Sequence, residues 1–210
     1  DLHSFPTRRS SDLEPGYSLG GLHATWAGLK YATVFGFSIA LSPSYWVTDN
    51  AILEDINTKQ EGSRFWFDLG TAEWQYYIPV YKKLQQAGYK PGEDCFYLEI
   101  KDAAHIAADW IKRIDYPLIA FAGINKDVSP KEMEVLIECI PSVSVPGKIY
   151  RRVNAIMTLK NGVKYSLSNM AAFSLLKGDI TLHDDGTIIA GTKATGSRSE
   201  ERRVGKECRS

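Results

Sequence analysis

The sequence has few of the features that mark disulfide-rich, metal-binding or nucleic-acid-binding proteins. Its three cysteines form no Cys-x-x-Cys pair and it has four histidines, which indicates neither a zinc site nor a disulfide framework. Its 25 basic and 25 acidic residues cancel, so no basic field predicts nucleic acid as a partner. The longest mostly apolar run, residues 31–41, falls short of the ~18 residues of a membrane span. With 44% hydrophobic residues, the composition is that of a globular protein. We expect no cofactor.

The two ends of the chain differ in character from the rest. Residues 1–13 and 198–210 are polar, lack an amphipathic period, and are compatible with one oligonucleotide read on opposite strands. They resemble translated sequencing adapters, so we treat them as non-native tails that carry no information on the fold. The natural segment is then residues 14–197, a fragment open at both ends, and no strand is expected in front of residue 16.

Residues 14–124 alternate short apolar runs with helical patterns, which predicts a parallel sheet with flanking helices. Asp49 or Asn50 is expected to begin the second helix, and Gly88 to end the third. In the last helix Trp110 shares a face with the isoleucines four residues to either side. The segment fits the C-terminal half of an open α/β domain. Strands are predicted over 34–42, 64–70 and 94–100, and helices over 19–31, 49–60, 72–89 and 103–114.

From residue 125 to residue 197 the pattern changes to short strands separated by turn signals. The Asn161-Gly162 and Asp185-Gly186 dipeptides lie between alternating runs and predict hairpins. A capping box that starts at Ser129 favours a helix over 130–140, but β-branched residues favour a strand, which we expect there. Further strands are predicted over 142–148, 150–167, 171–176 and 179–192. This spacing predicts a small antiparallel sandwich.

The pattern Gly-x-Ser-x-Gly at residues 16–20 places Ser18 directly before the first predicted helix. Such a turn exposes a serine hydroxyl when a strand enters it and a helix leaves it. The N-terminus of the helix adds backbone N–H groups and the positive end of the helix dipole. Ser18 is therefore the candidate nucleophile, and the Leu19 N–H is a candidate oxyanion donor.

A serine nucleophile needs a base and an acid, which hydrolases of this topology supply in the chain order Ser, acid, His. His105 follows the predicted strand 94–100, where catalytic groups collect at the carboxyl end of a parallel strand. Glu73 follows the strand 64–70 and is the preferred acid, with Asp68 and Asp102 as alternatives.

The motifs "GYSLGGLHA", "FGFSIALSPSYW", "FDLGTAEW" with "LQQAGY", and "KDAAHIAADW" resemble an esterase family of the α/β-hydrolases. That family includes feruloyl, acetyl-xylan and siderophore esterases, esterase D and mycolyltransferases. The resemblance covers residues 16 to about 123 and implies the same Ser18, Glu73 and His105. It also implies a second oxyanion donor from an upstream loop, so this fragment is expected to be inactive by itself.

The resemblance implies a small-molecule or carbohydrate-linked ester as substrate, hydrolysed through an acyl-enzyme. Tyr17, Trp46 and Trp74 are candidate pocket residues. Acyl transfer by the same three residues is an alternative. The segment 153–196 resembles bacterial Ig-like domains, which implies a secreted or periplasmic protein and leaves a non-catalytic binding role as a further alternative.

Overall fold

The computed structural model describes residues 13–73, 78–141, 149–167, 180–182 and 187–190 of the 210-residue chain. Two sheets organise these residues. The first is parallel, with the order β1-β2-β3-β4, and the second is antiparallel, with the order β5-β6-β9-β8 and β7 paired to β6. The strands of the parallel sheet are β1 (Leu13–Tyr17), β2 (Phe37–Leu41), β3 (Arg64–Gly70) and β4 (Cys95–Ile100).

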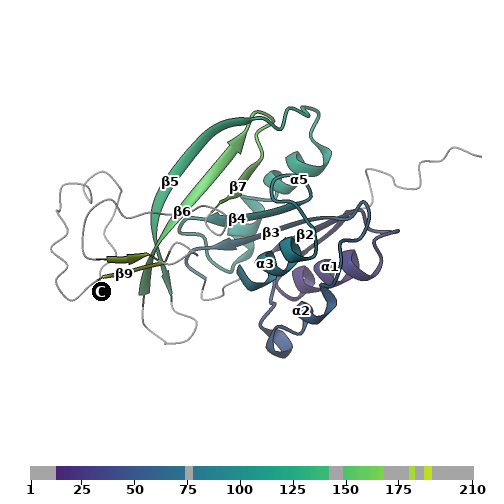
Figure 1. Ribbon diagram of the computed structural model, residues 1–210, viewed down its shortest axis with the longest axis horizontal. Helices are drawn as coiled ribbons and strands as arrows, with labels where there is room; N and C mark the ends of the chain where they lie inside the picture. Colours follow the sequence, from purple (N-terminus) through teal and green to yellow (C-terminus); the bar gives the residue numbers. More distant parts are fainter. Residues whose placement is uncertain (1–12, 74–77, 142–148, 168–179, 183–186, 191–210) are drawn as a thin grey trace, which may run out of the picture.

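Helices and the second sheet cover opposite faces of the parallel sheet (Figure 1). One face packs against α1 (Leu19–Lys30), α2 (Ile52–Asp55) and α3 (Ile78–Gln86). The other face meets α4 (Ala107–Ile111), α5 (Asp115–Ala122) and the long hairpin of β5 (Pro130–Pro141) and β6 (Ile149–Leu159). The remaining strands are β7 (Lys164–Ser166), β8 (Ile180–Leu182) and β9 (Thr187–Ala190). The parallel sheet with its flanking helices is a partial α/β fold.

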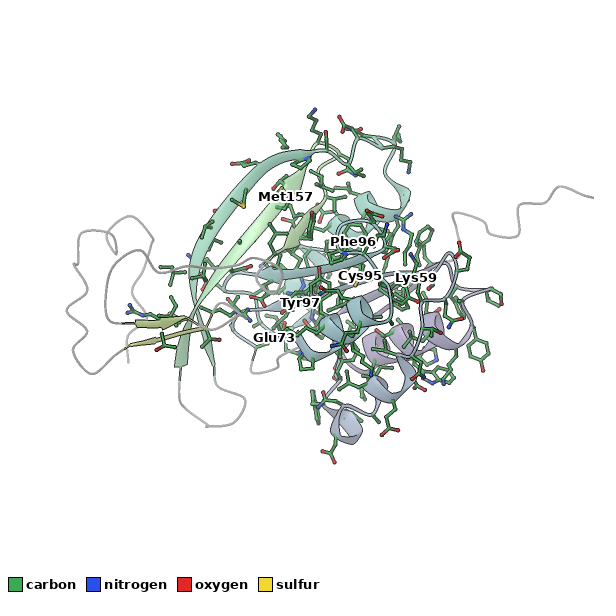
Figure 2. All side chains as sticks on the ribbon, in the orientation of Figure 1. Lys59, Glu73, Cys95, Phe96, Tyr97 and Met157 are labelled. Carbon is green, nitrogen blue, oxygen red and sulfur yellow. The ribbon has the colours of Figure 1, made fainter. Side chains whose placement is uncertain are left out.

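Alternation along the central strands explains both layers. In β3, Phe65 and Phe67 face the helical layer, while Trp66 between them faces the second sheet. Figure 2 shows the same division in β4, where Phe96 lies toward Met157 of β6 and Tyr97 points the other way. Each side chain named in β3 is at most 1% exposed. The strands are therefore buried on both faces, as parallel strands usually are.

The expectation that no strand precedes residue 16 is wrong. Residues Leu13–Tyr17 form β1, which pairs with β2 in parallel register from Leu13 opposite Phe37 to Tyr17 opposite Leu41. The segment LEPGY has no strand-like pattern, and Pro15 lacks an N–H group. At an edge of the sheet, hydrogen bonds to one neighbour are sufficient and Pro is tolerated.

Two predicted helices differ from the structure. Asp49 and Asn50 do not cap a helix, because both have positive φ (53° and 61°) at the end of a 3₁₀ turn, Val47–Asn50, and Ala51 precedes the four-residue α2. Of the helix predicted over 103–114 only Ala107–Ile111 (α4) is helical, a second helix, α5, begins at Asp115, and Ile106 in front of α4 is 52% exposed. Only part of the predicted apolar face is buried, with Trp110 at its centre.

Several other predictions agree with the structure. Residues 130–140 lie in a strand, because eleven residue pairs between β5 and β6 outweigh the local capping box. Asn161-Gly162 turns the chain between β6 and β7, with Gly162 at φ +91°. Gly88 follows α3 at φ +103°. The predicted strands 142–148 and 171–176 and the Asp185-Gly186 turn lie outside the described residues.

An Ig-like sandwich is not confirmed. The described strands after residue 129 form one sheet, in which β6 pairs with β7 near one end and with β9 near the other. Its inner side chains share a core with the parallel sheet: Ile156 and Leu159 pack in one cluster with Ile39, Trp66 and Phe96. The hairpin thus forms a layer that covers one face of the parallel sheet.

Candidate active site

Ser18 occupies a sharp turn between β1 and α1. Its backbone has φ 55° and ψ −122°, a conformation that non-glycine residues rarely adopt. The turn is held by Ser18 N–H donating to Leu41 O and by Ser18 O accepting from Leu22 N–H. A Cβ at Gly16 would lie 2.1 Å from Gly20 O, so the turn requires glycine at residue 16. This is the geometry of a nucleophile elbow, which presents the hydroxyl above the end of the strand.

His105 links Ser18 to Glu73. Its Nε2 lies 3.0 Å from Ser18 Oγ, and its Nδ1 lies 2.8 Å from Glu73 Oε2. A carboxylate only accepts hydrogen bonds, so Nδ1 carries the proton of the neutral ring and Nε2 accepts from the serine. The Glu73 side chain is fully buried, and that of His105 is 32% exposed. The three side chains come from the carboxyl ends of β1, β3 and β4.

Close approach of two loops brings Glu73 under His105. A Cβ at Gly70 would meet Ala103 O at 2.0 Å and Glu73 Oε1 at 2.9 Å, so only glycine lets the loops after β3 and β4 touch. The Gly70 N–H and the Ser42 hydroxyl both donate to Glu73 Oε1, at 2.8 and 2.6 Å. These bonds leave Oε2 directed at His105.

The two alternative acids lie elsewhere. Asp68 Oδ1 accepts from Ser42 N–H, and Oδ2 accepts from Trp66 Nε1, both at 3.2 Å. Burial raises the pKa of Asp68 to about 6, against the lowering effect of Arg113 nearby. Asp102 has φ 58°, and its N–H donates to Thr71 Oγ1. The acid role of Glu73 stays a prediction, with the geometry on its side.

Sequence reasoning missed several side chains around these residues. The Ser44 hydroxyl lies 3.1 Å from Ser18 Oγ. Asp109 accepts from Ala104 N–H at 2.9 Å, which fixes the loop before His105, and this bond lowers the pKa of Asp109. Trp110 meets His105 edge-on, with ring centroids 5.0 Å apart. A signal existed for Ser44, within the esterase-like "SPSYW" segment, but none for Asp109.

The candidate pocket residues have different surroundings. Tyr17 stacks on Trp110 at 4.4 Å and is 57% exposed, so it forms an aromatic surface beside His105. Trp46 is 48% exposed, and Trp74 lies outside the described residues. The structure also has a cavity of about 320 Å³ that the sequence did not predict. It is lined by Leu19, Leu22, His23 and Trp26 of α1 and by Ile52 and Asp55 of α2, with Ala51.

The described part of the chain has no group of three or more His, Cys, Asp or Glu side chains placed to hold a metal ion. In the same ranges, no helix has the length and apolar character needed to cross a membrane.

Comparison with solved structures finds crystals of the enterobactin esterase from Shigella flexneri. With 2,3-dihydroxy-N-benzoyl-glycine present, that protein is 26% identical over 52% of this chain and 31% of its own, at a TM-score of 0.42. With enterobactin present it is 27% identical over 48% of this chain and 28% of its own, at a TM-score of 0.41. With 2,3-dihydroxy-N-benzoyl-serine present it is 25% identical over 52% of this chain and 30% of its own, at a TM-score of 0.38. No family model and no curated protein sequence matches the chain. The matched segment thus spans less than a third of the esterase, and these TM-scores do not define the fold.

Proposed function

We propose that the chain carries the catalytic residues of a serine carboxylic-ester hydrolase of the α/β-hydrolase fold. Ser18 is the nucleophile, His105 the general base and Glu73 the acid that orients it. One observation carries the proposal: a continuous set of hydrogen bonds joins Ser18 Oγ, the two ring nitrogens of His105 and the buried Glu73 carboxylate.

The chemistry follows from these bonds. Ser18 Oγ attacks the ester carbonyl carbon while its proton passes to His105 Nε2. The buried Glu73 carboxylate stabilises the resulting imidazolium. His105 then gives the proton to the leaving alcohol, and the C–O ester bond breaks to leave an acyl-Ser18. A water molecule attacks the acyl group by the same route, which releases the acid and restores Ser18.

The Leu19 N–H is the proposed oxyanion donor. It is the first N–H of α1, where backbone donors have no acceptor within the helix and the dipole favours negative charge. A preorganised donor of this kind contributes about 3 kcal/mol to stabilisation of the transition state. The resemblance to the esterase family implies a second donor, for which we propose no residue of the described ranges.

The substrate class is an ester with an acyl or alcohol part that packs on aromatic surface. Tyr17 and Trp110 form a stacked pair beside His105, which suits a flat ring. Leu19, which follows the nucleophile in the chain, is one of the mostly apolar residues that line the open cavity between α1 and α2. Feruloyl, acetyl-sugar and siderophore esters remain the candidates.

The Ser18→Ala variant tests the proposal. The family resemblance implies that turnover needs a second oxyanion donor, so the readout is covalent labelling: we expect wild-type protein to react with a fluorophosphonate at Ser18, and Ser18→Ala to lose this labelling by at least about 10³-fold. Peptide mapping identifies the labelled residue. The matched control is Ser63→Ala, a buried serine bonded to Tyr89 away from the site. Equal labelling of wild type and Ser18→Ala would contradict the proposal, and ester formation with an added alcohol would indicate acyl transfer.

A further inference from the structure

A second buried charge cluster lies directly under Glu73, and the proposed mechanism does not use it. Arg113, in the turn between α4 and α5, is 1% exposed. Its Nη2 lies 3.2 Å from Asp68 Oδ1 and 3.5 Å from Glu73 Oε1, and it also donates to Ser42 Oγ. One cation therefore stands between two buried carboxylates.

The Ser42 hydroxyl joins the cluster to the proposed acid. It donates to Glu73 Oε1 at 2.6 Å and accepts from Arg113 Nη2 and from Trp110 Nε1. With two donors on its oxygen, its single proton has one direction left, toward Glu73. Arg113 thus acts on Glu73 both by its charge and by fixing the orientation of a hydroxyl.

The remaining atoms of Arg113 argue against a role in packing alone. Its Nε and Nη1 are buried and have no hydrogen-bond partner within the described part of the chain. A guanidinium in that state is costly to bury, and apolar side chains often replace buried ion pairs without loss of stability. What an apolar residue would not supply is positive charge beside Glu73.

We propose that Arg113, anchored by Asp68, is a positioning residue whose charge and whose bond to Ser42 hold the Glu73 carboxylate aimed at His105. The inference rests on the proposed function. Asp68 limits the effect, because its own charge offsets part of the Arg113 charge. Two further titratable groups face the cluster: Tyr45 interacts electrostatically with Asp68 from the helical layer, and Asp109 of α4 interacts with Arg113.

Charge variants give shifts of opposite sign, which a merely structural role would not. The measurement is the pH dependence of fluorophosphonate labelling at Ser18 in the 210-residue chain. Reaction requires neutral His105 and ionised Glu73. A change of charge next to them shifts the pH at which each requirement is met in the same direction. Arg113→Met adds net negative charge and should move the acid limb up by about half a pH unit or more, with a tenfold or greater loss of rate at about pH 7. Asp68→Asn removes negative charge and should move the limb down.

The double variant Arg113→Met/Asp68→Asn removes one charge of each sign and should return the acid limb close to the wild-type position. It also keeps the test decisive if Arg113→Met alone does not fold, since paired removal leaves the net charge of the cluster as it is in the wild type. The control is Arg152→Met, which removes another fully buried arginine, the partner of Glu99 on β4. It should leave the acid limb in place.

A second readout separates failure of this inference from failure of the proposed function. The NMR resonance of the His105 Nδ1 proton reports the bond to Glu73 without any turnover. As the pH is lowered, this resonance should disappear at a higher pH in Arg113→Met than in Asp68→Asn. If that resonance disappears at the expected pH in each variant but Ser18 is not labelled, the proposed esterase function is wrong and the role of Arg113 stands. Labelling at Ser18 with the same pH dependence in wild type, Asp68→Asn and the double variant would overturn the inference alone.

Discussion

At the scale of single residues, the site depends on side chains that are absent as much as on those present. Gly16 and Gly70 leave room where a Cβ would come within 2.1 Å of a carbonyl oxygen. The first lets the chain turn at Ser18, and the second lets the Glu73 and His105 loops meet. A glycine in either place is a condition for the hydrogen bonds of the site.

Gly16→Ala should therefore destabilise the protein by about 2–4 kcal/mol, because the new methyl group would overlap Gly20 O. The matched control is Gly20→Ala, where nothing lies within 4 Å of the new Cβ and helix propensity favours alanine by about 1 kcal/mol. Urea unfolding measures both. Equal midpoints for the two variants would show that the turn relaxes at no cost.

Burial of Asp68 makes the stability of the folded chain depend on pH. Burial raises the pKa of Asp68 from 3.8 to about 6, so the folded chain binds this proton more tightly than the unfolded chain. The contribution to stability is complete below the unfolded value and is lost as pH rises through about 6.

In the wild type, the unfolding free energy should fall between about pH 4 and 6.5 as Asp68 loses its proton. In Asp68→Asn this fall should be smaller by on the order of 2 kcal/mol, since Asn does not titrate. Urea unfolding across this pH range provides the measurement. Asp127→Asn is the control, because Asp127 is exposed and Ser129 lowers its pKa, so its titration lies below the range. If the slope of unfolding free energy against pH is unchanged in Asp68→Asn, a group other than Asp68 takes up the proton.

At the scale of elements, β6 connects the two sheets. Arg152 on β6 pairs with Glu99 on β4, and both side chains are at most 1% exposed. The Glu99 carboxylate also accepts from Tyr97 OH at 2.5 Å, and the Ser166 hydroxyl on β7 accepts from Glu99 N–H. Polar bonds thus fix the register of the hairpin against the edge of the parallel sheet.

Arg152→Met should lower the unfolding free energy by about 3–5 kcal/mol, because Glu99 would keep a buried charge without its cation. The double variant Arg152→Met/Glu99→Gln removes both charges and should recover more than half of that loss. Chemical denaturation compares them. Additive losses in the double variant would mean that the pair is not coupled.

At the scale of the whole molecule, one core serves both sheets. Leu136, Ile156 and Val163 from the hairpin region pack in the same cluster as Trp66 and Phe96 of the parallel sheet. Trp66 is 0% exposed and Phe96 is 3% exposed in this cluster, to which the hairpin region, α4 and α5 all contribute. This arrangement opposes independent folding of the segment before residue 125.

A chain ending at residue 126 should therefore fail to fold as a soluble monomer, because the uncovered face would present a large apolar patch. The 210-residue chain should unfold in one cooperative transition, followed by tryptophan fluorescence and circular dichroism together. Two separate transitions, or a stable monomer from the shortened chain, would favour the two-domain division drawn from the sequence.

The sequence by itself determined much of the parallel layer. The central strands β2, β3 and β4 were predictable because their apolar runs are continuous. The positions of strand ends also made candidates of Ser18, Glu73 and His105, which lie within hydrogen-bonding distance of one another in the order Ser18, His105, Glu73. The Asn161-Gly162 hairpin followed from local turn chemistry. These features depend on neighbours within a few residues, which a sequence pattern records.

Only the tertiary structure decided the rest. Strand β1 exists because an edge of β2 was open to its backbone, and a five-residue segment with Pro15 carries no pattern that says so. The hairpin became a covering layer because its apolar side chains fit the exposed face of the sheet. Asp68 of β3 and Arg113, which follows α4, form an ion pair although they lie 45 residues apart in sequence. Long-range packing and buried charge pairs depend on which surfaces meet in space, and no local pattern encodes that.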